Sequence, residues 1–239
     1  MASQLYAIRF GATRPAELAR FWGGVLGREV DPGARGGGVE LPAGDVGQLR
    51  IRFVESQAPK VGQNRMHFDL TSATDEEQQA IVERVLVFGG RHLDIGQGSD
   101  APNVVLADPD GNELDIIEAG NNFLAGTGQI GALACDGSQA VGYFWSEALG
   151  WPLVWDQDEE TAIQAPEGGT KITWGGPPVE PQQGKNRLTF DLVVPAGEDR
   201  DAEIARLVSL GAKHVGTGDD GHVEMTDPDG TEFSVLPVR

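Results

Sequence analysis

The chain has 239 residues, which is enough for one large domain or for two smaller ones, since single domains cluster near ~100–150 residues. Its hydrophobic content of 39% and charged content of 23% are typical of a chain that buries a core. Acidic residues outnumber basic ones by 37 to 18, and the net charge of −19 disfavours a nucleic-acid partner because the phosphate backbone would be repelled.

No apolar run approaches the ~18–20 residues that a membrane span needs, and the first residues lack a basic segment followed by an apolar one. We therefore expect no membrane partner. The only cysteine, Cys135, excludes an internal disulfide and a multi-cysteine metal site. A reducing cytoplasm suits this composition.

Taken in chain order, the sequence predicts a strand, a helix and several short strands, and then the same series again. The first strand, 5–10, alternates in polarity, and the helix after it, 15–26, carries apolar residues at helical spacing. Glycine-rich turns separate short strands at 38–41 and 49–54. After a strand at 65–70, a second helix begins at Thr74, with Glu77 completing a capping box, and stops at Gly89-Gly90, with Ile81, Val85 and Phe88 predicted to face inward. Strands at 91–95, 103–106 and 113–117 complete the first half.

The second half of the chain repeats the first. Phe21-Trp22 recurs as Phe144-Trp145, the run 64–70 (Asn-Arg-Met-His-Phe-Asp-Leu) recurs at 186–192, and the Asp-Pro-Asp-Gly turn at 108–111 recurs at 227–230. The last helix of the second copy is predicted near 199–210. We therefore predict one domain at 1–120 and a second at 128–239, joined by a glycine-rich linker at 121–127.

These motifs, in this order and twice over, resemble the vicinal oxygen chelate superfamily, which holds glyoxalase I, extradiol dioxygenases and bleomycin-resistance proteins. The resemblance implies an α+β fold of two tandem domains, each made of paired βαβββ modules that form a cupped mixed sheet. It also implies that the floor of a cup can hold one divalent metal ion, with about one ligand from each of four strands.

Matching the family's ligand positions to this chain gives a partial set in the first domain. His67 matches the family's histidine, and Asp115 stands where a glutamate usually closes the site. Tyr6 and Arg52 fall at the two remaining positions, and a protonated guanidinium would repel a cation. The resemblance thus implies a possible divalent metal at His67 and Asp115, which would also be the catalytic residues of an enzyme.

In the second domain the matching positions are Gln129, Trp174, Thr189 and Ser234. None is an ionised ligand, so no metal is expected there. Gln129 and Trp174 are instead candidates for ligand contact, together with Tyr6 and Arg52 in the first domain. Trp151, Trp155 and Trp174 could form an aromatic wall for a flat ligand, or could serve packing between the domains. Trp145 matches Trp22 and is predicted to be core.

Three roles are open for His67. It could bind a metal, it could line the cup as a histidine hydrogen-bonded to Asp115 or Tyr6, or it could pair with an Asp for general acid–base chemistry without metal.

Two functional classes follow from the resemblance. The first, favoured by the incomplete ligand set, is a non-catalytic protein that holds an antibiotic or another small organic molecule. The second is a metal-assisted lyase, isomerase or epimerase acting through an enediolate or enolate in the first domain, with the second as scaffold. A dioxygenase is disfavoured because the matched positions lack two histidines and one carboxylate. Either protein is expected to be a monomer or weak homodimer.

Overall fold

The computed structural model describes residues 2–33, 38–98 and 100–237. Within them the chain folds into four modules in the order that the sequence predicts, the first of the form βαββ and the other three of the form βαβββ. The first half contains β1 (Gln4–Ala12), α1 (Pro15–Leu26), β2 (Val39–Leu41), β3 (Ile51–Glu55), β4 (Met66–Leu70), α2 (Asp75–Val87), β5 (Arg91–His92), β6 (Val104–Ala107) and β7 (Glu113–Ile116). The second contains β8 (Ile130–Cys135), α3 (Gln139–Leu149), β9 (Leu153–Gln157), β10 (Glu160–Gln164), β11 (Lys171–Trp174), β12 (Leu188–Val193), α4 (Arg200–Leu210), β13 (Lys213–Thr217), β14 (Val223–Thr226) and β15 (Glu232–Val235).

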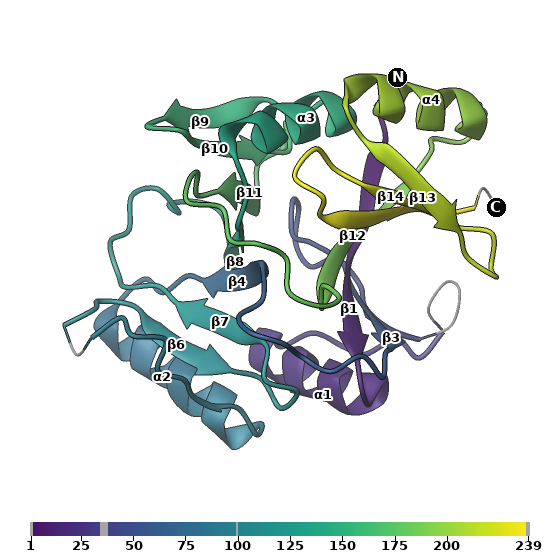
Figure 1. The fold of residues 1–239 in the computed structure, drawn as a ribbon. Helices are drawn as coiled ribbons and strands as arrows, with labels where there is room; N and C mark the ends of the chain where they lie inside the picture. Colours follow the sequence, from purple (N-terminus) through teal and green to yellow (C-terminus); the bar gives the residue numbers. More distant parts are fainter. Residues whose placement is uncertain (1, 34–37, 99, 238–239) are drawn as a thin grey trace.

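The strands form two mixed sheets, and each sheet takes one module from each half of the chain. The seven-stranded sheet has the order β13-β14-β15-β12-β1-β3-β2, and the eight-stranded sheet has the order β5-β6-β7-β4-β8-β11-β10-β9. Both therefore join strands that are far apart in the sequence, as Figure 1 shows for β1 beside β12 and β4 beside β8. The α+β class and the paired modules are confirmed. The prediction that each cup belongs to one copy is wrong, because the first module pairs with the fourth and the second with the third.

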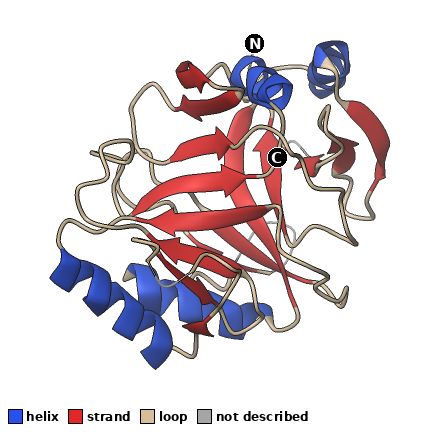
Figure 2. Cartoon of the chain, turned by 60° about the vertical axis from the view of Figure 1, so that its left-hand side comes forward, coloured by secondary structure: helices blue, strands red, loops and turns tan. Residues whose placement is uncertain are grey.

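The helices lie in two pairs at opposite ends of the molecule, α1 against α2 and α3 against α4, with the strands between them (Figures 1 and 2). Each pair therefore comes from one half of the chain although its strands lie in different sheets. At the first pair, Phe88 occupies the space that a Cβ on Gly24 would fill. Phe88 is 46% exposed, so the prediction that it points inward is wrong, whereas Ile81 and Val85 are buried.

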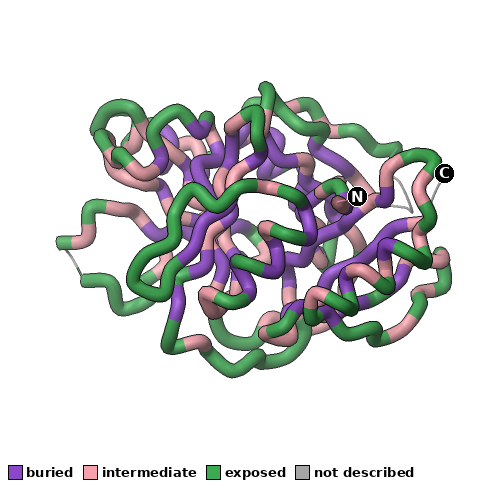
Figure 3. The backbone as a smooth tube through the Cα atoms, turned by 90° about the horizontal axis from the view of Figure 1, so that it is seen from above, coloured by how far each residue is buried: buried purple, intermediate pink, exposed green. Residues whose placement is uncertain are grey.

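Each half keeps an aromatic core of its own behind the sheets. Trp22 packs on Phe10 and Phe68, and Trp145 packs in the same way on Phe190 and Phe233. Both tryptophans are almost completely buried, as predicted for Trp145. Figure 3 shows the buried residues concentrated along the central strands, with the exposed ones in the outer loops. Within the described residues, no helix is long and apolar enough to cross a membrane.

The two Asp-Pro-Asp-Gly turns, which join β6 to β7 and β14 to β15, are hydrogen-bonded to these aromatic cores. Asp108 accepts hydrogen bonds from the indole Nε1 of Trp22 at 3.2 Å and from the backbone N–H of Asn112 at 2.9 Å. Asp227 accepts hydrogen bonds from the indole Nε1 of Trp145 at 3.2 Å and from the backbone N–H of Thr231 at 2.9 Å. Burial raises the pKa of each carboxyl to about 6, against the effect of these hydrogen bonds. The turn motif is thus an acceptor for a buried indole as well as a change of direction.

These raised pKa values predict a pH dependence of stability. Between about pH 4 and 6 the folded chain binds protons at Asp108 and Asp227 that the unfolded chain does not, so their contribution to stability is greatest below pH 4 and is lost as the pH rises through about 6. Asp227→Asn should reduce the fall in unfolding free energy between pH 4 and 7 by on the order of 2 kcal/mol. Urea unfolding at several pH values measures this. The exposed change Glu83→Gln should leave the slope as in the parent, and an unchanged slope in Asp227→Asn would contradict the assignment.

Candidate functional site

The pairing of the modules redistributes the predicted site residues between the two sheets. His67 and Asp115 lie in the eight-stranded sheet, on β4 and β7, whereas Tyr6 and Arg52 lie in the seven-stranded sheet, on β1 and β3. The prediction that these four residues share one cup is therefore wrong. The physical reason is that β4 forms its antiparallel ladder with β8 of the second half, and β1 forms its own with β12. We name the two helix-free sheet faces the eight-stranded cup and the seven-stranded cup.

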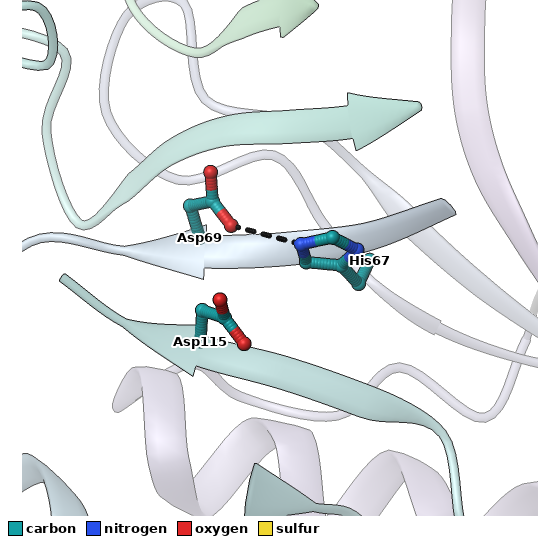
Figure 4. Close-up of side chains that lie close together, drawn as sticks. All are labelled: His67, Asp69 and Asp115. Carbon is teal, nitrogen blue, oxygen red and sulfur yellow. Dashed lines mark ion pairs between the residues drawn. The ribbon is translucent and has the colours of Figure 1, made fainter. Parts of the chain in front are cut away.

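Three side chains converge in the eight-stranded cup. His67 and Asp69 are two residues apart on β4, so they share a face, and Asp115 is the parallel partner of Asp69 on β7. One ligand atom from each residue lies within 4.8 Å of the other two. Figure 4 shows the three side chains gathered over the two strands, with the His67 Nε2 to Asp69 Oδ1 ion pair, 3.3 Å long, drawn as a dashed line. We call this set the His-Asp-Asp cluster.

The surroundings of the cluster favour a positive charge at its centre. Burial lowers the pKa of His67, but the hydrogen bond and charge of Asp69, with the charges of Asp115 and Glu113, outweigh it and raise that pKa above 6.5. Burial also raises the pKa of Asp115, helped by the charge of Asp69, while His67 and Asn103 act in the opposite direction. Two neighbouring carboxylates repel each other unless a proton or a cation lies between them.

The hydrogen bonds leave part of the cluster available. Asn103 Nδ2 donates to Asp115 Oδ2 at 2.8 Å, which holds that carboxylate in place. Asp69 Oδ1 is buried and, apart from its contact with His67, has no hydrogen-bond partner among the described residues. One imidazole nitrogen and two carboxylates on one face, with an unsatisfied oxygen among them, fit a divalent cation that keeps open positions for water or a ligand.

Small side chains form the floor beside the cluster. Ala134 is the cross-strand partner of His67, and Ala132 is that of Asp69. Continuing away from the cluster, Thr173 lies beside Ala134, and Ala162 beside Thr173. This row ends at Trp155, which is 37% exposed and makes an edge-to-face contact with Phe123. The second half of the chain thus supplies a row of small side chains beside the cluster and one aromatic residue at the end of that row.

The seven-stranded cup has the equivalent strand pairings but carries different side chains. Thr189 and Asp191 on β12 occupy the positions of His67 and Asp69, and the neighbouring Arg9 and Arg52 replace Ala134 and Thr173. Arg52 forms an ion pair with the fully buried Asp191 at 2.7 Å, and Arg9 donates to Thr189 at 3.0 Å. The carboxylate is therefore already paired with guanidinium groups.

The two remaining predicted residues of this cup are Tyr6 and Ser234. Tyr6 donates its hydroxyl to Glu40 at 2.9 Å, and Arg50 forms an ion pair with the same carboxylate at 2.7 Å. Ser234 is buried, and its Oγ has no hydrogen-bond partner among the described residues. No group of three metal-ligating side chains occurs here within the part of the chain that the structure describes.

Two predicted ligand-binding residues lie away from the cluster. Trp174 is 2% exposed and belongs to the hydrophobic core, so its interpretation as a ligand contact is wrong. Trp151 packs against that core as well, so Trp155 alone of the three tryptophans remains in the proposed aromatic wall. Gln129 precedes β8 and lines a surface depression with Thr71 and Gly128.

Sequence reasoning missed Asp69, the third member of the cluster. The signal was present, because residues two apart on a strand face the same way. In the sequence analysis Asp69 appears only as part of the repeated run 64–70. Arg9, which donates a hydrogen bond to Thr189 in the seven-stranded cup, was missed as well.

The comparisons with known proteins agree with this architecture. A family model described as the glyoxalase-like domain matches residues 7–117 and again residues 131–236. The chain belongs to the glyoxalase-like domain family. It is thus a tandem member of the vicinal oxygen chelate superfamily, as the motifs indicated. No curated protein matches the sequence.

Solved structures share the fold of this glyoxalase-like chain at low sequence identity. Glyoxalase I from Zea mays superposes with a TM-score of 0.67 at 13% identity, over 98% of this chain and 92% of the maize chain. A Bacillus subtilis protein whose suggested activity is that of a dioxygenase superposes with a TM-score of 0.61 at 17% identity, over 97% of this chain and 84% of that one. At these identities the likeness establishes the fold alone.

The electrostatics of the cluster give a direct prediction. In Asp69→Asn the imidazole keeps its burial but loses its nearest negative charge, so the pKa of His67 should fall below its value in the parent protein by about one unit or more. Titration of the imidazole resonances by NMR in metal-free protein measures this. Glu83→Gln removes an equal charge from the exposed side of α2 and should leave the titration in place. Equal curves for Asp69→Asn and the parent would show that the pair is not formed in solution.

Proposed function

We propose that this glyoxalase-like protein binds a divalent metal ion at His67, Asp69 and Asp115, and that the ion holds and activates a small organic molecule through two neighbouring oxygen atoms. The supporting observation is the convergence of one imidazole and two carboxylates, all half-buried, within 4.8 Å on one face of a sheet. With Asp69 included, the ligand set is no longer the incomplete one that favoured a metal-free binder.

The chain's own groups suit this role. Imidazole nitrogen and carboxylate oxygen are ligands of divalent ions such as Zn²⁺, Mn²⁺ or Fe²⁺. Asn103 donates a hydrogen bond to Asp115, and such a bond orients a carboxylate for metal binding. A bound ion would withdraw electron density from two oxygens of the ligand and so stabilise an enolate or enediolate. The strand neighbours of the cluster, Ala132 and Ala134, carry no charge that would compete with a metal ion.

Proton competition sets the pH range of metal binding. His67 must lose its proton to bind a metal, and its pKa is raised, so metal affinity should fall as the pH drops through that raised value. Metal binding should accordingly release a proton at pH values below that raised pKa.

The metal site is tested by titrating chelator-treated protein with Zn²⁺ and Mn²⁺ in a calorimeter. The parent protein should bind one ion, and His67→Ala and Asp69→Asn should each weaken binding more than about 100-fold, because even an outer-shell partner is worth about 10–100-fold. Thr189→Ala, at the equivalent place in the seven-stranded cup, should bind as the parent does. Equal losses in all three variants, or no loss in any, would refute the site.

An enzyme and a non-catalytic binder are separated by a second measurement. In D₂O, metal-loaded parent protein should speed the exchange of the methylene protons of hydroxyacetone, an α-hydroxy ketone, beyond the rate with the same concentration of free metal. Proton NMR follows this exchange, and His67→Ala should lose the acceleration. Saturable binding of hydroxyacetone without any acceleration would favour the binder.

A further inference from the structure

The repeated Asn-Arg pairs meet at a second cavity. Asn64-Arg65 comes directly before β4, and Asn186-Arg187 comes directly before β12. Both pairs line one cavity of about 260 Å³ between segments 61–65 and 180–187. The fold therefore brings the two repeated Asn-Arg pairs to the same cavity.

Arg187 is the least satisfied charged group in this cavity. Its side chain is 6% exposed. Its hydrogen bond to the Ala58 carbonyl is 3.4 Å long, its contact with Asp110 is 3.9 Å, and its Nε has no hydrogen-bond partner among the described residues. Contacts of that length are weak, and a guanidinium that is buried without close acceptors is costly. The geometry therefore favours an additional acceptor beside Arg187.

The other unsatisfied groups lining the cavity are also donors. Within the described chain, Asn186 Nδ2 is buried with no hydrogen-bond acceptor. Arg65 Nε makes no hydrogen bond either, although it lies 3.4 Å from the Asp136 carboxylate. The exposed Lys185 adds a third cation to the lining. Donors without acceptors on several sides indicate an occupant that is rich in acceptor oxygens.

The charges around the cavity agree with this. Arg65, Lys185 and Arg187 stand against two acidic lining residues, Asp136 and Glu180, and Asp136 is already paired with Arg65. The lining therefore carries a net positive charge in a chain whose overall charge is −19. At physiological salt the screening length is about 8 Å, so the distant acidic residues matter less than the local cations.

We propose that this cavity binds a small oxyanion, a molecule that carries a carboxylate or phosphate group, through Arg187, Asn186 and Lys185. Guanidinium groups match both anions because two N–H donors can meet two oxygens. The site does not depend on the His-Asp-Asp cluster, since none of its donors belongs to that cluster.

The test uses the full-length, chelator-treated protein, so that metal binding does not enter the result. Inorganic phosphate and malonate are titrated separately at about 0.15 M constant ionic strength, where surface charges are screened, with binding followed by calorimetry and by the arginine Nε–H resonances. At least one anion should bind saturably and shift an arginine resonance. Binding of phosphate alone identifies a phosphate site, and binding of malonate alone identifies a carboxylate site.

Matched variants locate the site. Arg187→Met should weaken the bound anion about tenfold or more, and the exposed change Lys185→Met about threefold, because a charge-assisted hydrogen bond is worth about 1.5–3 kcal/mol and an exposed ion pair less. Arg20→Met removes the same charge from the exposed side of α1 and should change affinity less than about twofold. If Arg187→Met does not fold, Arg187→Lys and Asn186→Ala serve in its place. Absence of saturable binding by both anions, or equal losses in Arg20→Met, would overturn the proposal.

Discussion

The chemistry of this protein depends on which strands pair across its two halves. The ladders between β1 and β12 and between β4 and β8 are the only direct strand contacts between the halves within the described residues. Because side chains alternate along a strand, each ladder fixes which residues face a common cup. The β4–β8 ladder puts alanines beside the His-Asp-Asp cluster, and the β1–β12 ladder puts Arg9 beside Thr189.

The two cups therefore differ in the charged groups that face their equivalent aspartates, Asp191 and Asp69. In the seven-stranded cup, Asp191 is fully buried against Arg52, and removing one partner of such a pair typically costs about 3–5 kcal/mol. That carboxylate is held by the fold and is not available to a metal ion. In the eight-stranded cup, within the described residues, the equivalent Asp69 forms its ion pair with His67 at 3.3 Å and not with a guanidinium group. The duplication preserved the aspartate in both cups and changed its neighbours.

The sequence predicted the local structure better than the site. The helix at Pro15–Leu26 and the capping of the second helix by Thr74 follow from local patterns and are confirmed. The pairing of 66–70 with 130–135 is not written in any local pattern, because the residues that form the ladder are compatible with several partner strands. For that reason the prediction that Tyr6 and Arg52 share a cup with His67 was wrong. The prediction that Trp174 contacts a ligand was wrong because a one-residue difference in register moves a strand residue from the cup face to the core face.

The arrangement also changes the role of the second half. It was expected to be a scaffold beside an active first domain, yet it provides Ala132 and Ala134, the strand neighbours of the His-Asp-Asp cluster, and Thr173 beside them. The first half provides Arg9 and Arg52, which neutralise Asp191 of the second. Each half therefore completes the other's cup within one chain, and a second copy is not needed to complete either sheet. Substitutions at Ala132 or Ala134 of the second half can therefore alter the surroundings of the cluster without changing its own side chains.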